Sequence, residues 1–343
     1  MLLSLHDEFE LIRSIKKTVG SNSKRVCLPI GDDAAVAESP KGKLVATIDT
    51  MVEGVHFDLT YTTPRELGHK ALAVSLSDIA AMGATPLYAL VSIGLKQELQ
   101  EYFVTELYEG MKALSKKYGV DIIGGNTVQA PQAILVDVAL VGQVGKTFFT
   151  RSGAKFGDCL AVTGSLGTSA AGLSCLKLLG RQETNHHPEL LRAHLMPEPR
   201  IRESLALQAA GGVTSMIDIS DGLAREIHHL ADNSKVGMWL DEEKLPVSLE
   251  THRAGTLVGM DPFRWVLYGG EDYELLFTFS PKKLQAIQKS FRRLKTAFTV
   301  IGSVTERKSG VKMRTRAGAE VKLEPSGWNH FVRRKKPSAV AVT

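Results

Sequence analysis

Acidic residues of this sequence fall where strands and helices are predicted to end. Residues 44–48 are apolar and β-branched enough to predict a short buried strand, which ends on Asp49 and is followed closely by Glu53 and His56. A carboxylate at the end of a buried strand is unfavourable unless a positive partner meets it. Six more acids occupy comparable places: Asp33, Asp78, Asp218, Asp221, Glu271 and Asp272.

This repeated placement indicates one kind of site. Carboxylates gathered without a cation would repel one another and raise each other's pKa values. Magnesium takes hard oxygen ligands and keeps water and substrate phosphates in its shell. Phosphoryl transfer needs mainly positioning and charge stabilisation, with little covalent chemistry from the protein. The pattern therefore predicts that several magnesium ions and a polyphosphate meet at these acids.

Each acidic turn also has a structural explanation, and these explanations stay open at this point. The pair before Ala34 follows a glycine and suits a plain turn. Ser220 or Asp221 would cap a helix that begins after Gly222. Asp78 lies near the C-terminal end of a crowded helix over residues 64–82, where the helix dipole disfavours a negative charge. A cation, or a buried hydrogen bond to a hydroxyl, would satisfy it.

Two glycine-containing segments could bind phosphate or a nucleotide, and only one of them stays a candidate. Gly124 and Gly125 follow an apolar run, and paired glycines let a backbone approach a ligand closely or simply make a tight turn. Residues 142–147 read GQVGKT but lack the glycine that a P-loop needs six positions before its lysine, because Leu140 stands there. We therefore reject a P-loop.

Composition is that of an ordinary soluble protein, and patterning predicts both helices and strands. A chain of 343 residues suggests two domains. Helices are expected over residues 7–19, 64–82, 104–118 and 281–294, and strands over residues 87–95, 134–144, 159–163, 213–217 and 273–279. A second domain is expected to begin at about residue 148, and the polar stretch 181–199 is expected at the surface.

Charge and cysteine content exclude several classes of protein. The net charge is only +5, and the basic run at residues 333–336 is expected to be a solvated tail with no nucleic-acid or membrane role. The three cysteines form neither a disulfide framework nor a zinc pattern. The sequence shows neither a signal peptide nor a membrane span, so we expect a cytoplasmic protein.

Five motifs in order carry a family resemblance, namely IGDDAAV, TIDTMVEGVHF, SLSDIAAMGATP, MIDISDGL and GGEDYELLFT. Together with DEFELI near the start and GWNHF near the end, they resemble the thiamine-monophosphate kinases, within the superfamily of aminoimidazole ribonucleotide synthetase. The resemblance implies a two-domain α/β (α+β) fold. Residues 1–147 would form an ATP- and metal-binding dimerisation domain whose sheet or barrel spans a homodimer. Residues 148–332 would form a C-terminal α/β domain, and residues 333–343 a basic tail.

The resemblance also assigns roles to residues. The expected magnesium ligands are Asp33, Thr47, the Ile48 backbone, Asp49, Asp78, Asn126, Asp218 and Asp221, and Asp33, Asp49, Asp218 and Asp221 would be essential to catalysis. The expected nucleotide contacts are Tyr108, Gly125, Asn126, Arg151 and Ser220. His56, Glu271 and Trp328 would contact thiamine phosphate, with Trp328 stacking on the substrate or anchoring the C-terminal segment. Asn126 replaces an aspartate common in the family, and Thr168 departs from a common GDS sequence and receives no role.

The implied reaction is direct in-line transfer of the ATP γ-phosphate to thiamine monophosphate, assisted by several magnesium ions. Another ATP-dependent synthetase of the superfamily is one alternative, such as selenophosphate synthetase, which needs a reactive cysteine or selenocysteine near its N-terminus. Cys27 stands near that place, but it lies in an apolar strand and is expected to be structural. A catalytically silent nucleotide-binding relative is the second alternative, and Asn126 is the one candidate loss of a ligand.

Overall fold

The computed structural model describes residues 8–20, 23–31, 34–294 and 296–328. In its N-terminal half, strands β3 to β6 form a mixed sheet in the order β3-β6-β4-β5, and β1 pairs separately with β2. The elements are α1 (Glu8–Val19), β1 (Val26–Leu28), β2 (Val36–Ala37), β3 (Lys43–Val52), α2 (Pro64–Ala81), β4 (Thr85–Leu95), α3 (Glu101–Tyr118), β5 (Asp121–Gln129) and β6 (Leu135–Val144). This sheet is open, with β3 and β5 at its edges.

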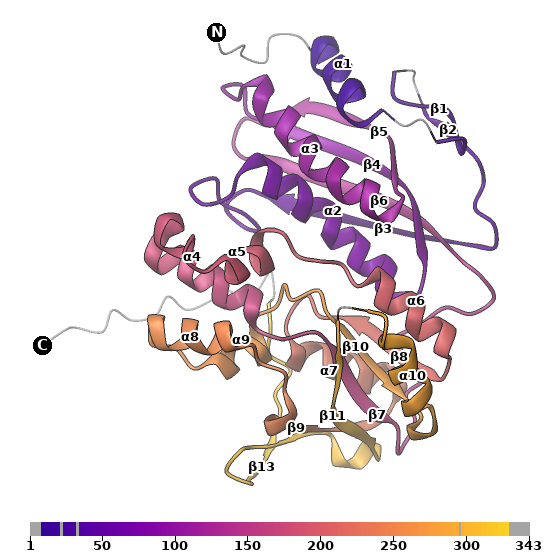
Figure 1. The fold of residues 1–343 in the computed structure, drawn as a ribbon, viewed down its shortest axis with the longest axis vertical. Coiled ribbons are helices and arrows are strands. Elements are labelled where there is room, and N and C mark those ends of the chain that lie inside the picture. The colour runs from indigo at the N-terminus through magenta and orange to yellow at the C-terminus, as the bar shows by residue number, and fades with distance from the viewer. Residues whose placement is uncertain (1–7, 21–22, 32–33, 295, 329–343) are drawn as a thin grey trace, which may run out of the picture.

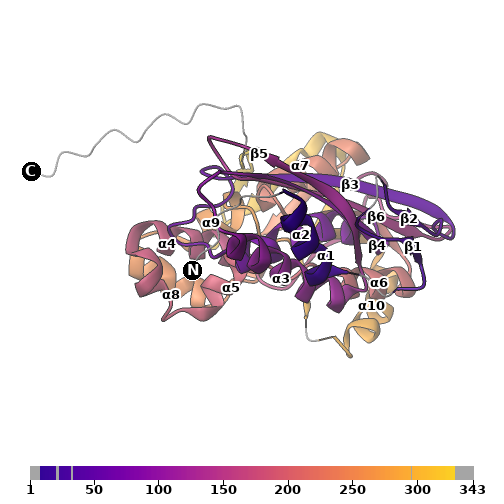
Figure 2. The ribbon, with the colours of Figure 1, turned by 90° about the horizontal axis from the view of Figure 1, so that it is seen from above.

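The C-terminal half is built on a seven-stranded sheet of order β13-β12-β9-β11-β7-β10-β8. Its strands are β7 (Cys159–Thr163), β8 (Val213–Asp218), β9 (Gly237–Asp241), β10 (Leu275–Phe279), β11 (Phe298–Thr305), β12 (Val311–Arg314) and β13 (Glu320–Lys322). Its α-helices are α4 (Thr168–Thr184), α5 (Pro188–Leu195), α6 (Ile201–Ala210), α7 (Leu223–Ser234), α8 (Leu249–Val258), α9 (Pro262–Tyr268) and α10 (Leu284–Phe291), with short 3-10 turns at Glu242–Lys244, Pro281–Lys283 and Arg307–Ser309. Figures 1 and 2 show α4, α5, α8 and α9 gathered at one end of the molecule.

Helix α2 joins the two halves (Figure 1). It begins with a capping box, in which Thr63 accepts from the Glu66 amide and the Glu66 carboxylate accepts from the Thr63 amide, with Pro64 in the first turn. Most of its side chains are buried, because β3 and β6 pack on one side while α6 and β8 pack on another. One hydrophobic core therefore runs from Ile79 of this helix to Phe277 of the C-terminal sheet.

The main expected elements are confirmed, and some local expectations are corrected. The strand at residues 44–48 continues to Val52, so Asp49 lies inside β3, and Ile48 is 65% exposed rather than buried. Gly124 and Gly125, for which a tight turn was one of two interpretations, lie within β5. The stretch 181–199 contains α5. No helix in the described part of the chain is long and apolar enough to cross a bilayer. The boundary at residue 148 stays a prediction.

Candidate functional site

Three aspartates, Asp49, Asp78 and Asp218, meet where β3, α2 and β8 come together, and we call them the acidic cluster. Two serines of α2 donate hydrogen bonds to Asp49 and Asp218, the two members that lie on strands. Ser75 Oγ donates to Asp49 Oδ2 at 2.8 Å, and Ser77 Oγ donates to Asp218 Oδ2 at 2.6 Å. The cluster therefore draws on both halves of the chain.

The electrostatics of the acidic cluster show that burial and mutual repulsion outweigh the positive charge near it. Burial and then the charge of Asp78 raise the pKa of Asp49 to about 6. Burial also raises the pKa of Asp78, against a hydrogen bond from Thr47 Oγ1 at 2.5 Å and the charge of Arg151. Burial, followed by the charge of Asp78, raises the pKa of Asp218 to about 7. A cation bound here would relieve both desolvation and mutual repulsion.

The turn after β8 brings a further acid to the acidic cluster. Glu226 of α7 is buried, and its Oε1 accepts from the Asp221 amide at 3.1 Å. Burial, then the charge of Asp218, raises the pKa of Glu226 to about 8. Helix α7 has Gly222 at its N-cap and no capping bond from a side chain, so Ser220 and Asp221 do not serve as the cap.

The donors of the acidic cluster suit magnesium chemically. They are carboxylate oxygens, with a hydroxyl and backbone oxygens nearby, and this is the donor set that hard divalent cations take. No three His, Cys, Asp or Glu side chains of the described residues form a ready-made metal cage. Magnesium normally binds through one or two carboxylates and completes its shell with water and substrate phosphates. The arrangement fits that mode of binding.

His56 and Glu271 lie close together, from opposite halves of the chain. The charge of His56 is among the groups that act on the Glu271 carboxyl. The Val52 amide donates to His56 Nδ1 at 3.0 Å, so a neutral His56 carries its proton on Nε2. The loop is anchored by Glu53, which pairs with Lys96 at 2.8 Å.

The C-terminal segment reaches the same turn. The Trp328 amide donates to the Asp221 carbonyl at 3.0 Å, and the Glu271 amide donates to the Ser220 carbonyl at 2.7 Å. The Trp328 side chain is half-buried. The Ser220–Asp221 turn therefore connects the residues expected at the metal site with two of those expected to contact thiamine phosphate.

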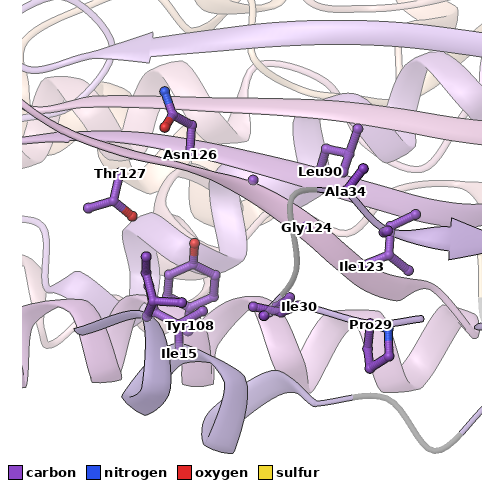
Figure 3. Close-up of a pocket in the computed structure, with 14 residues that line it drawn as sticks. Ile15, Pro29, Ile30, Ala34, Leu90, Tyr108, Ile123, Gly124, Asn126 and Thr127 are labelled. Atoms are coloured by element: carbon purple, nitrogen blue, oxygen red, sulfur yellow. The ribbon is translucent and has the colours of Figure 1, made fainter. Parts of the chain in front are cut away.

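A second group of expected residues lines a pocket of about 790 Å³ at the edge formed by β5. Tyr108, Gly125 and Asn126 all contribute to it, together with apolar residues of α1 and of residues 29–35 (Figure 3). Figure 3 shows Asn126 and Thr127 on opposite sides of their strand, with Tyr108 on the Thr127 side. A Cβ at Gly125 would lie 1.8 Å from the Val91 carbonyl oxygen, so only glycine fits there.

The remaining expected residues are placed differently. Asp33 lies outside the described residues. Ile48 points its side chain away from the acidic cluster, and only its backbone could serve there. Arg151 is exposed, and its charge acts on Asp78 and Glu226. Asp272 accepts from the Gly167 amide at 2.8 Å, at the start of α4, and burial raises its pKa to about 8.

Several residues of the site were missed in the sequence. Ser75 and Ser77 carry a signal that was available, since hydroxyls on a buried helix must find partners. Glu226 has the same signal, because α7 is amphipathic and this acid falls on its buried face. Lys70 of α2 carries the same signal, since it is 1% exposed and a buried ammonium group also needs a partner.

Comparison with known proteins agrees with this architecture. Residues 31–144 match the family model "AIR synthase related protein, N-terminal domain", and residues 155–314 match the corresponding C-terminal domain. A thiamine-monophosphate kinase of Bacillus subtilis is 38% identical over 95% of this chain and 99% of its own length.

Solved structures of such kinases share the fold. The thiamine-monophosphate kinase of Stenotrophomonas maltophilia superposes with a TM-score of 0.79 at 33% identity, over 91% of this chain and 97% of the other. AaThiL, solved in complex with AMPPCP and TMP, gives a TM-score of 0.76 at 37% identity, over 94% and 97% of the two chains. Both halves and their order thus agree, and the chain belongs to the AIR synthase related family and, within it, to the thiamine-monophosphate kinases.

Proposed function

We propose that this protein transfers the γ-phosphoryl group of ATP directly to thiamine monophosphate, giving thiamine diphosphate. The observation that carries the proposal is the acidic cluster, in which carboxylates from both halves lie close enough to raise one another's pKa values. Relatives at this level of identity are thiamine-monophosphate kinases, and one of them binds AMPPCP and TMP together. Such a pair of anions needs the compensating positive charge that the cluster would recruit.

Magnesium is the cofactor that these donors fit. Asp49, Asp78 and Asp218 would hold the ions, with Thr47, the Ile48 backbone, Asp221, Asn126 and Asp33 as the further expected ligands. Bound magnesium would neutralise phosphate charge and align the two reacting groups. The chain's own part is to keep these oxygens buried and fixed, which Ser75 and Ser77 do through their hydrogen bonds.

The substrates would occupy the two flanks of the acidic cluster. The pocket beside Tyr108 and Gly125 is proposed for the nucleotide, with Arg151 and Ser220 as additional contacts. His56, Glu271 and Trp328 are proposed for thiamine monophosphate, with Nε2–H of His56 as a donor. The acceptor phosphate is already largely ionised near neutral pH, its second pKa being about 6. No strong general base and no covalent enzyme intermediate are needed.

The outer face of the four-stranded sheet supports a homodimer. Leu44, Ile48, Leu90 and Val128 expose 42% to 65% of their surfaces on this sheet. Apolar side chains gathered on a sheet face are a common signature of an interface. We propose that a second copy covers this face, next to the nucleotide pocket.

Coupled ADP release tests the function. We expect turnover with ATP, magnesium and thiamine monophosphate, but not with thiamine or without acceptor, and the product mass should be that of thiamine diphosphate. Asp49→Asn and Asp218→Asn should each lower kcat at least about a hundredfold, since charge stabilisation is the main catalytic contribution. Asp232→Asn, at an exposed position of α7, is the matched control.

Two further readouts sharpen this test. Magnesium with nucleotide should raise the melting temperature of the wild type but not of Asp218→Asn. A phosphorylated protein on the reaction path would contradict direct transfer. Nucleotide binding without turnover on any acceptor would indicate a silent relative, and Asn126→Asp would then show whether the missing carboxylate is the cause.

A further inference from the structure

Lys70 is the most deeply buried cationic side chain near the acceptor site. It lies on α2 and is 1% exposed. An ammonium group removed from water is strongly unfavourable unless an anion compensates it. Its partner is Glu271 of the loop after α9, with Nζ 2.9 Å from Oε1. At this distance the two groups form a close ion pair.

The other oxygen of Glu271 is held as well. His194 of α5 is buried, and its Nδ1 lies 3.3 Å from Glu271 Oε2. An ionised carboxylate only accepts hydrogen bonds, so this contact is favourable with the His194 proton on Nδ1. Burial and the charge of Lys70 keep the pKa of His194 low, at about 3, so the ring is neutral. Glu271 is thus fixed between a cation and a neutral donor.

The backbone at Glu271 is also constrained. Glu271 has φ of 57° and Tyr273 has φ of 51°, both in the left-handed region that non-glycine residues seldom adopt. Their amides donate to the carbonyls of Ser220 and Ile219 at 2.7 and 2.9 Å. Such strain persists only where surrounding contacts over-determine it, and it is common at ligand-binding sites. Here the side chain is fixed by Lys70 while the backbone is fixed by the turn after β8.

Burial by itself would favour a neutral Glu271. The charge of Lys70, the largest influence opposing burial, holds the pKa of Glu271 below its ordinary value. The carboxylate therefore stays negative in a half-buried place. Thiamine monophosphate carries a cationic thiazolium ring and an aminopyrimidine, and a fixed anion suits both.

We propose that Lys70 is a positioning residue for the acceptor site: without touching thiamine monophosphate, it holds Glu271 in the orientation that binds it. This inference rests on the proposed function, in which Glu271 contacts the acceptor. Lys70 and Asp78 are eight residues apart on one helix, which sets them about 12 Å apart along its axis. Helix α2 therefore carries both Lys70, which holds Glu271, and Asp78 of the acidic cluster on a single rigid element.

The test compares wild type, Lys70→Met, Glu271→Gln and the double variant. Dissociation constants for thiamine monophosphate and for ATP are measured by calorimetry, and KM and kcat are measured by ADP release. Lys70→Met should raise Kd and KM for thiamine monophosphate at least tenfold while changing those for ATP less than twofold. In the Glu271→Gln background, Lys70→Met should add no further loss of acceptor affinity.

The control is Lys117→Met, which removes a lysine from another ion pair between the two halves, with Glu198. Its acceptor Kd should match that of the wild type. A lower melting temperature of Lys70→Met with an unchanged acceptor Kd would overturn the proposal, because the lysine would then be only structural. If Lys70→Met does not fold, the double variant decides: the same acceptor Kd as Glu271→Gln supports the proposal, and a further tenfold loss overturns it. A wild type that neither binds nor phosphorylates thiamine monophosphate would overturn the proposed function and this inference with it.

Discussion

Acidification should destabilise this protein through His194, and the effect can be isolated with one substitution. Burial, followed by the charge of Lys70, lowers the pKa of His194 from 6.5 to about 3. Because the folded-state pKa lies below that of the unfolded chain, the stability contribution is fully present above pH 6.5 and is lost as the pH falls toward 3. Within this window each pH unit removes about 1.4 kcal/mol of unfolding free energy.

The variant His194→Asn removes the titration but keeps a donor. The Asn amide nitrogen occupies nearly the place of Nδ1, so it can still donate to Glu271, and it takes up no proton. Between about pH 7.5 and pH 5, the wild type should lose about 2 kcal/mol relative to the variant. Asp218 and Glu226, whose raised pKa values make acid stabilising, are present in both proteins and cancel in the comparison.

Urea unfolding followed by tryptophan fluorescence at the two pH values measures this difference. His186→Asn, at an exposed position between α4 and α5, is the control and should follow the wild type at both pH values. A difference between wild type and His194→Asn that is the same at both pH values, within about 0.5 kcal/mol, would refute the reasoning. His194 would then gain its proton without cost, and the Lys70–Glu271 pair would not be as enclosed as its contacts indicate.

Three further predictions concern packing and assembly. In a urea titration, Gly68→Ala should lower the unfolding free energy by about 1–3 kcal/mol, because its Cβ would lie 1.8 Å from a backbone oxygen of α3. The control is Gly145→Ala, whose Cβ meets open space and which should leave the unfolding free energy nearly unchanged. Arg200→Met should lower the unfolding free energy by about 3–5 kcal/mol, because it leaves the buried Glu274 without its bidentate partner. Adding Glu274→Gln should recover part of that loss, and a double variant no more stable than Arg200→Met would contradict this. Leu44→Glu should convert the proposed dimer into monomers in sedimentation velocity, and an unchanged sedimentation coefficient would place the interface elsewhere.

Local sequence signals predicted the elements that carry the acids. The apolar run before Asp49, the crowded helix around Asp78 and the strand before Asp218 each have a clear pattern within a few residues. The extent of β3 was not available locally, because residues 50–52 become strand by pairing with residues 135–137 of β6. Helix α5 was overlooked despite a usable signal, since Pro188 in the first turn and the buried Leu190 and Leu195 fit an amphipathic helix.

Partnerships between distant residues could not be predicted without the fold. Nothing in the sequence around Lys70 indicates Glu271 as its partner, because the two are joined only when α2 packs against the C-terminal half. The same holds for Ser77 and Asp218. What was predictable is that a lysine and a serine on a buried helix need partners; which partners they find depends on tertiary structure.

Both halves of the chain contribute residues to the candidate site. The acidic cluster takes Asp49 and Asp78 from the N-terminal half and Asp218 from the C-terminal half, while the anchor Glu271 is held by Lys70 across the same boundary. A hinge opening between the halves would break both sets of contacts, and it would also expose the core that continues from Ile79 across to the C-terminal sheet. Because interiors packed in this way resist deformation, we expect folding, and not closure of one half on the other, to set the relative position of the proposed metal and acceptor sites. The two anions of the proposed reaction would then be brought together by residues that are already in place, as transfer without a general base or a covalent intermediate would require.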